Sequence, residues 1–225
     1  MSKGWGAPDT EPTRLVLLRH GQTPLSVERR FAGRGDIPLT EEGHAQAEAA
    51  ARRLARRRID AVVSSPLRRT RDTAAHAAEA LGLPVEIDEG FVETDFGVWE
   101  AMTFAEARSE DPAAVDRWLA DPRTAPPGGE SFFEVAERVG AAREALVERY
   151  RGRTVLVVTH VTPIKVVVQQ SMLAPLEALY RMHLDTACLT EVDVFSDGPM
   201  VVRSLNDTAH LASDPGGGTP VAATA

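Results

Sequence analysis

Two histidines each follow a short apolar run of the sequence. His20 comes after residues 14–18 and Arg19, and His160 comes directly after residues 154–159. Runs of this length and composition predict strands that are buried on both faces of a sheet. Ligands of parallel α/β sheets bind beyond the carboxyl ends of the strands. We therefore expect His20 and His160 to reach one crevice, although a histidine at a strand end can also be only a hydrogen-bonded polar group.

The neighbours of these histidines add groups that bind anions. Arg19 precedes His20, and Gly21 follows it, which allows a tight turn with close approach of the backbone. Arg69 lies near the start of a predicted helix that follows a second apolar strand, 60–64. A guanidinium matches phosphate oxygens with a planar fork of donors, and it also keeps a nearby histidine neutral and nucleophilic. Together these residues indicate phosphoryl chemistry.

Strands and helices alternate along the chain. Ser131 and Glu134 match a capping box, and Ser65-Pro66 predicts another helix start, because proline is tolerated in the first turn. The alternation predicts an α/β fold with three layers, α/β/α, around a mostly parallel sheet. We expect strands at 14–18, 60–64, 84–88, 154–159, 187–195 and 200–205, and helices at 40–57, 65–82, 103–120 (two, broken at Asp111-Pro112), 131–150 and 163–173.

Composition indicates one globular domain with polar ends. The chain has 225 residues, of which 43% are hydrophobic and 26% charged, which is ordinary globular usage. Residues 1–13 and 212–225 are rich in Gly, Pro and small residues, so we expect a flexible linker or tail at 1–13, a folded domain at 14–211 and a disordered tail at 212–225.

Charge and cysteine content exclude several classes of protein. The net charge of −8 argues against a nucleic-acid coat or a polybasic membrane binder. One cysteine, Cys188, allows no internal disulfide and no Cys-rich metal site, and the other histidines lack metal-ligand spacing. No apolar run is long enough to span a membrane and no secretory signal is visible, so the expected location is the cytoplasm. The two lysines are Lys3 and Lys165; nearly all other positive charge is arginine, a bias typical of genomic base composition.

Six blocks in the same order as in a known family carry a resemblance. The sequence resembles the histidine phosphatase, or phosphoglycerate mutase-like, superfamily over residues 14–211. Within it, the chain is similar to the phosphatase half of actinobacterial fusions that join ribonuclease H to an α-ribazole-phosphatase-like domain. The blocks are Arg19-His-Gly-Gln-Thr23, Asp36-Ile-Pro-Leu-Thr40, Ser64-Ser-Pro-Leu-Arg-Arg69, Val92-Glu-Thr-Asp-Phe-Gly97, Pro127-Gly-Gly-Glu-Ser131 and Val158-Thr-His160.

The resemblance implies a role for five catalytic residues. His20 is the nucleophile and forms a phosphohistidine, while Arg19, Arg69 and His160 hold the phosphoryl oxygens. Glu93 protonates the leaving oxygen and then activates water. Without the resemblance, Glu93 and Asp95 would be interpreted as solvated carboxylates of an acidic loop. Positions that line the phosphate pocket in relatives correspond here to Gly21, Gln22, Thr23, Ser26, Ala32, Gly33 and Val161.

The implied activity is that of an acid phosphatase-like phosphomonoesterase. The expected substrate is a small phosphorylated metabolite, with α-ribazole 5′-phosphate as one candidate. The expected enzyme needs no metal or other cofactor. Two alternatives stay open, a phosphoglycerate mutase and a catalytically silent phospholigand-binding protein. Ser26 stands where many relatives have Asn, and Val161 where Gly is common, so both departures alter the expected pocket.

Overall fold

The computed structural model describes residues 11–212. The predicted flexible segments 1–13 and 212–225 therefore lie almost wholly outside the described residues. The first strand, β1 (Thr13–Arg19), begins one residue before the predicted domain boundary, and Thr13 is buried and pairs with Val194. The last described element is a 3₁₀ turn, η4 (Ala209–Leu211).

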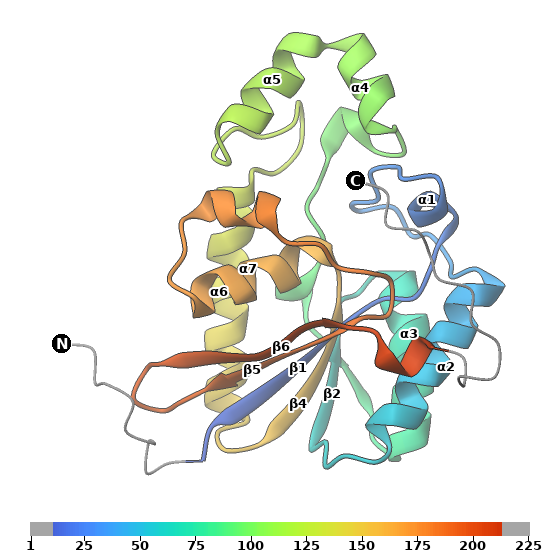
Figure 1. The fold of residues 1–225 in the computed structure, drawn as a ribbon, viewed down its shortest axis with the longest axis vertical. Coiled ribbons are helices and arrows are strands. Elements are labelled where there is room, and N and C mark those ends of the chain that lie inside the picture. The colour runs from blue at the N-terminus through green and yellow to red at the C-terminus, as the bar shows by residue number, and fades with distance from the viewer. Residues whose placement is uncertain (1–10, 213–225) are drawn as a thin grey trace.

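Six strands of the described chain form one mixed sheet, drawn in Figure 1. Its order is β3-β2-β4-β1-β5-β6. The four strands from β3 to β1 are parallel, while β5 is antiparallel to β1 and β6 is antiparallel to β5. The strands other than β1 are β2 (Ala61–Ser64), β3 (Val85–Ile87), β4 (Thr154–Thr159), β5 (Leu189–Val194) and β6 (Met200–Asp207).

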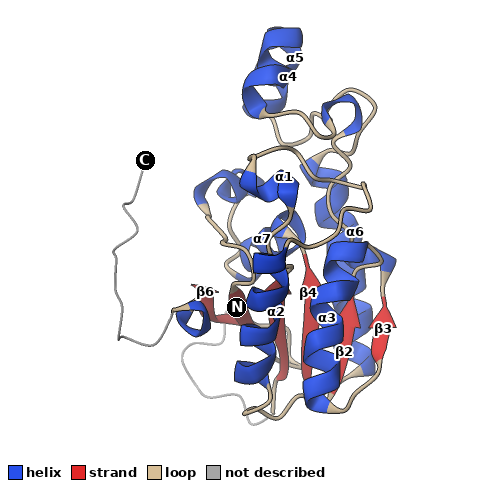
Figure 2. Ribbon diagram, turned by 90° about the vertical axis from the view of Figure 1, so that its right-hand side faces the viewer, coloured by secondary structure: helices blue, strands red, loops and turns tan. Residues whose placement is uncertain are grey.

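Helices cover both faces of this sheet, as Figure 2 shows. α2 (Glu41–Leu54) and α3 (Arg68–Leu81) lie on one face, and α6 (Phe132–Arg149) and α7 (Val161–Ser171) lie on the other. Alternate residues of β1 enter the two resulting cores: Val16 joins the α2–α3 side and Leu17 the α6–α7 side, both with no exposed surface. This arrangement confirms the predicted three-layer α/β/α fold.

A helical extension stands above the carboxyl ends of the parallel strands. It consists of α4 (Phe104–Glu110) and α5 (Pro112–Ala120), which break at Asp111 as predicted, and it forms the top of Figure 1. Asp111 caps α5 because its side chain accepts the Ala114 N–H. The remaining elements are α1 (Pro24–Val27) and the 3₁₀ turns η1 (Glu89–Phe91), η2 (Gly97–Trp99) and η3 (Leu176–Arg181).

Three predicted helix boundaries are wrong. α3 begins at Arg68 and not at Ser65-Pro66: Leu67 is the extended N-cap residue, and the Ser65 side chain bonds to His160. α7 begins at Val161, directly after β4, so it starts two residues before the predicted 163. α2 ends at Leu54, three residues before the predicted end. Residues 11–212 contain no helix that is long and apolar enough to cross a bilayer.

Candidate active site

The sheet brings the two strand-end histidines together. β1 and β4 are neighbours, and their register pairs Arg19 with Thr159, the residues just before His20 and His160. Both histidines are buried, and their ring centroids lie 5.2 Å apart with the ring planes at 61°. The structure therefore places the two side chains in one crevice at the carboxyl edge of the sheet, as the strand pattern predicts.

His20 is held in one tautomer by its own loop. Nδ1 lies 2.8 Å from the carbonyl oxygen of Gly21, and a carbonyl can only accept, so Nδ1 carries the proton and Nε2 keeps a free lone pair. Burial, and then the charges of Arg69 and Arg19, hold the pKa of His20 well below its usual 6.5. Gly21 is required here because a Cβ would lie 2.3 Å from the Gly43 carbonyl oxygen.

His160 is fixed through both ring nitrogens. Arg69 Nε donates to Nδ1 at 3.2 Å, so Nε2 carries the proton and donates to Ser65 Oγ at 2.7 Å. Burial, and then Arg69, keep the pKa of this ring well below 6.5 as well. Ser65 is therefore a positioning residue that the sequence analysis missed; its place at the end of β2, next to β4, was the available signal.

Arg69 ties this cluster to the loop after α1. Its Nη atoms donate to the carbonyl oxygens of Ala32 at 3.0 Å, Gly33 at 2.7 Å and Gly35 at 2.8 Å. With the bond to His160, four of its five N–H donors are in use. Burial lowers the pKa of Arg69 to about 10, which leaves the guanidinium charged at neutral pH.

Arg19 presents a donor that no protein group uses. Its Nη1 donates to the Leu184 carbonyl oxygen at 2.6 Å, whereas its buried Nε has no hydrogen-bond partner among the described residues. An unsatisfied buried donor costs about 1–3 kcal/mol, and a substrate oxygen would remove that cost. Desolvation by the surrounding residues lowers the pKa of Arg19.

Glu93 is buried beside the start of α7. Its Oε1 accepts the Thr94 N–H at 2.8 Å, and the Thr162 N–H lies 3.3 and 3.4 Å from its two oxygens. Thr162 belongs to the first turn of the helix that follows His160, so Glu93 approaches the two histidines across the β4–α7 junction. The structure thus brings all five predicted catalytic residues to one edge of the sheet.

The predicted pocket-lining residues lie around this cluster, but several of their polar groups already have partners. Gln22 Oε1 accepts from Thr40, and Thr23 and Ser26 cap α1 reciprocally. The Gly33 N–H donates to Glu100 at 3.0 Å. Val161 is the first residue of α7. Their contacts with substrate remain predictions.

The described residues outside the catalytic cluster contain a histidine pair and a cavity but no metal site. Among residues 11–212, no group of three or more His, Cys, Asp or Glu side chains could hold a metal ion. Nδ1 of His44, on α2, lies 3.2 Å from Nε2 of His76, on α3, and this pair offers only two ligands to a metal ion.

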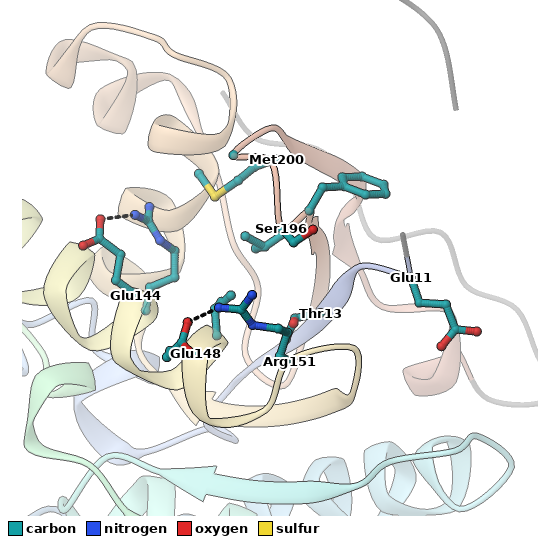
Figure 3. Close-up of a pocket in the computed structure, with 12 residues that line it drawn as sticks. Glu11, Thr13, Glu144, Glu148, Arg151, Ser196 and Met200 are labelled. Carbon is teal, nitrogen blue, oxygen red and sulfur yellow. Dashed lines mark hydrogen bonds and ion pairs between the residues drawn. The ribbon is translucent and has the colours of Figure 1, made fainter. Parts of the chain in front are cut away.

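A cavity of about 370 Å³ lies near the start of β1, far from His20. As Figure 3 shows, its glutamates are paired: Glu144 with Arg143, and Glu148 with Arg151.

Residues 15–208 match the family described as the histidine phosphatase superfamily (branch 1). The chain belongs to this superfamily. Membership confirms the resemblance inferred from the six sequence blocks and makes the chain an enzyme of the histidine phosphatase type.

Named relatives agree with this membership. The chain is 52% identical to the "Bifunctional protein Rv2228c" of Mycobacterium tuberculosis, over 93% of the chain and 58% of that protein. It is 32% identical to phosphoserine phosphatase 1 of Hydrogenobacter thermophilus, over 88% of the chain and 94% of that protein. A solved structure of mycobacterial glucosyl-3-phosphoglycerate phosphatase with VO₃ is 33% identical at a TM-score of 0.79, covering 86% of this chain and 99% of that one.

The chain therefore spans little more than half the length of the mycobacterial relative. The word "bifunctional" in that protein's name, together with its greater length, is consistent with the predicted branch of fused phosphatase domains.

Proposed function

We propose that this chain is a phosphomonoesterase that hydrolyses a small phosphorylated metabolite through a phosphohistidine on His20. The observation that carries the proposal is the state of the His20 ring: it is buried and neutral, and its Nδ1 proton is engaged by Gly21, so Nε2 is free to attack. A ring in this state needs no general base to become a nucleophile.

In the first step, Nε2 of His20 attacks phosphorus and the bond from phosphorus to the alcohol oxygen breaks. The unpaired Nε of Arg19 and the remaining N–H of Arg69 bind the nonbridging oxygens, where negative charge is held throughout the transfer. Glu93 gives its proton to the departing alcohol oxygen, so the products of this step are the free alcohol, phosphohistidine and the Glu93 carboxylate.

In the second step, water attacks the phosphohistidine. Glu93 takes one proton from that water as the new oxygen–phosphorus bond forms and the nitrogen–phosphorus bond breaks. Inorganic phosphate, neutral His20 and protonated Glu93 result, which restores the starting state. His160 stays neutral and orients Arg69, since its Nδ1 accepts from Arg69 and its one N–H donates to Ser65.

The names of relatives set the range of candidate substrates. They include a phosphoserine phosphatase, a glucosyl-3-phosphoglycerate phosphatase and an α-ribazole phosphatase. Each named activity removes phosphate from an organic molecule, which supports a phosphomonoester substrate here. α-Ribazole 5′-phosphate remains one candidate among these.

The decisive experiment follows the phosphoryl group. Substrate labelled in its phosphate should transfer acid-labile, base-stable label to the wild-type protein, and His20→Ala should lose both this label and roughly a thousandfold or more of kcat. His44→Ala, at an exposed histidine of α2, is the matched control for the loss of an imidazole. Turnover by His20→Ala at a rate comparable to wild type would refute the proposal.

A further inference from the structure

A cavity of about 280 Å³ lies between the helical extension and α7. Four of the eight residues that line it are aromatic: Phe104 of α4, Trp118 of α5, Phe132 of α6 and Tyr180 of η3. The chain thus uses aromatic residues from four separate elements to build an apolar hollow, which is the usual character of a small-molecule site.

This cavity adjoins the catalytic carboxyl group. Thr162 lines the cavity, and its backbone N–H is the one that lies 3.3 and 3.4 Å from the Glu93 oxygens. Lys165 lies three residues further along α7 and lines the same cavity, because residues i and i+3 share one face of a helix. The cavity and the Glu93 carboxyl group therefore share Thr162 as a common neighbour.

Lys165 supplies a cation to the apolar wall. Its Nζ donates to the Leu179 carbonyl oxygen at 2.9 Å, which uses one of three ammonium donors. It forms no ion pair with any described residue; partial burial lowers its pKa, and the charge of Glu93 raises it. An ammonium that is partly desolvated and has no carboxylate in direct contact can be paired by an anionic ligand.

A residue of the same wall, Trp118, has a polar group without a hydrogen-bond partner in the described chain. The indole N–H of Trp118 is buried and has no hydrogen-bond partner in the described chain. Buried donors in native structures are nearly always paired with protein, water or ligand. The wall therefore contains two donor groups, on Lys165 and Trp118, whose hydrogen-bonding capacity is incompletely used.

We propose that this cavity is the leaving-group subsite and that it selects phosphomonoesters whose alcohol part joins a ring-sized apolar body to a carboxylate. The body packs between Phe104, Trp118 and Tyr180, and the carboxylate binds Lys165. A cavity of roughly 150 Å³ already admits benzene, so this volume holds one ring with a substituent. The inference rests on the proposed phosphomonoesterase activity.

The test compares kcat/KM for phenyl phosphate, 3-carboxyphenyl phosphate and glycerol 2-phosphate. A meta carboxylate barely changes the acidity of the phenol, so the ratio of the two aryl esters reports recognition and not leaving-group chemistry. We expect the wild type to favour the carboxylated ester roughly tenfold, as a charge-assisted hydrogen bond implies. In Lys165→Met this ratio should approach one, whereas Lys165→Arg should keep most of it.

Two controls separate recognition from folding. Arg58→Met removes one exposed cation beside the amino end of β2 and should keep the wild-type ratio. A merely structural Lys165, holding the Leu179 carbonyl, would lower kcat/KM for all three esters equally and leave the ratio unchanged. If Lys165→Met does not fold, the wild type can be inhibited with 3-hydroxybenzoate and with phenol. The subsite predicts a lower inhibition constant for 3-hydroxybenzoate, because only this compound has a carboxylate.

The outcomes distinguish the two proposals. Hydrolysis of the aryl esters without preference for the carboxylated one, or an equal ratio in wild type and Lys165→Met, would overturn the subsite and leave the phosphatase proposal intact. No hydrolysis of any ester by the wild type would overturn the proposed function and the subsite with it.

Discussion

At the scale of single residues, hydrogen-bond geometry assigns the proton on each site histidine. The Gly21 carbonyl must accept, which leaves Nε2 of His20 unprotonated, whereas Arg69 Nε must donate, which puts the proton of His160 on its Nε2. Two neighbouring imidazoles thus have opposite tautomers, one a nucleophile and the other a donor. This division follows from their partners and not from the rings themselves.

The role of Glu93 can be tested with the leaving group. An alkoxide needs a proton as it departs, but p-nitrophenolate barely does. Glu93→Gln should therefore slow phosphohistidine formation from an alkyl phosphate by roughly a hundredfold and from p-nitrophenyl phosphate far less. Single-turnover measurement isolates this step from the later hydrolysis, in which Glu93 acts again.

Asp95→Asn is the matched control, since Asp95 lies two residues away and its carboxylate caps the Gly97 N–H. Equal losses on both substrates in Glu93→Gln would mean that the residue orients the phosphate or acts only in hydrolysis.

Metal removal tests the source of positive charge at the phosphate. Arg19 and Arg69 supply two guanidinium groups where other phosphoryl-transfer sites use Mg²⁺. Exhaustive dialysis against EDTA should leave at least about half of kcat/KM. Activity that is lost on dialysis and restored by a divalent cation would show that a metal takes part.

At the scale of elements, the loop at residues 32–35 is held from both sides. Its carbonyl oxygens accept from Arg69, and the N–H groups of Gly33 and Arg34 donate to the Glu100 carboxylate at 3.0 and 2.9 Å. Glu100 lies between η2 and α4, so the segment that leads into the helical extension also fixes the loop that orients Arg69.

Glu100→Gln should weaken this link. The glutamine side chain keeps one oxygen acceptor, but its NH₂ group faces the backbone N–H of Gly33 or Arg34. Loss of that hydrogen bond lowers the free energy of unfolding by about 1–3 kcal/mol. We expect KM for a simple phosphomonoester to rise roughly tenfold because Arg69 is no longer held in place, with a smaller change in kcat. Steady-state kinetics and a urea titration measure the two effects, and Glu110→Gln, at an exposed position of α4, should change neither. An unchanged KM with lowered stability would assign Glu100 a structural role only.

The elements also show where sequence patterns carry information. The buried strand 154–159 and the capped helix after Ser131 were predicted within one residue, since their signals are local. The start of α3 was predicted wrongly because Ser65-Pro66 has the composition of a helix start, while the hydrogen bond from His160 to Ser65 Oγ comes from 95 residues away. Contacts of that separation have no local signature.

At the scale of the whole molecule, the layered fold follows from the alternation of strands and helices, but the site geometry does not. The crevice could be predicted because a histidine directly follows both β1 and β4, and parallel strands end at one edge of the sheet. The links through Ser65, Thr162 and Glu100 could not, since each joins segments whose pairing only the folded chain defines. The aromatic cavity likewise assembles from five elements, α4, α5, α6, α7 and η3, spread over residues 104–180.

The buried histidines also tie global stability to pH. The pKa values of His20 and His160 in the folded chain are well below the 6.5 of an unfolded histidine. Below about pH 6.5 the unfolded chain therefore binds more protons than the folded chain, so the free energy of unfolding decreases as the pH decreases. Each ring makes the free energy of unfolding change by up to about 1.4 kcal/mol per pH unit. Carboxylates with lowered pKa, such as Asp207 at about 2, lose their stabilising effect only at lower pH, below about 3.8.

Urea titrations at pH 7.0, 6.0 and 5.0 would measure this dependence in the absence of phosphate. His20→Asn removes one titrating ring, so its unfolding free energy should decrease by about 1.4 kcal/mol less per pH unit than that of the wild type below pH 6.5. Equal slopes for wild type and His20→Asn would mean that His20 takes up its proton in the folded state at an ordinary pH. In that case the neutral nucleophile on which the proposed reaction depends would not exist at acidic pH.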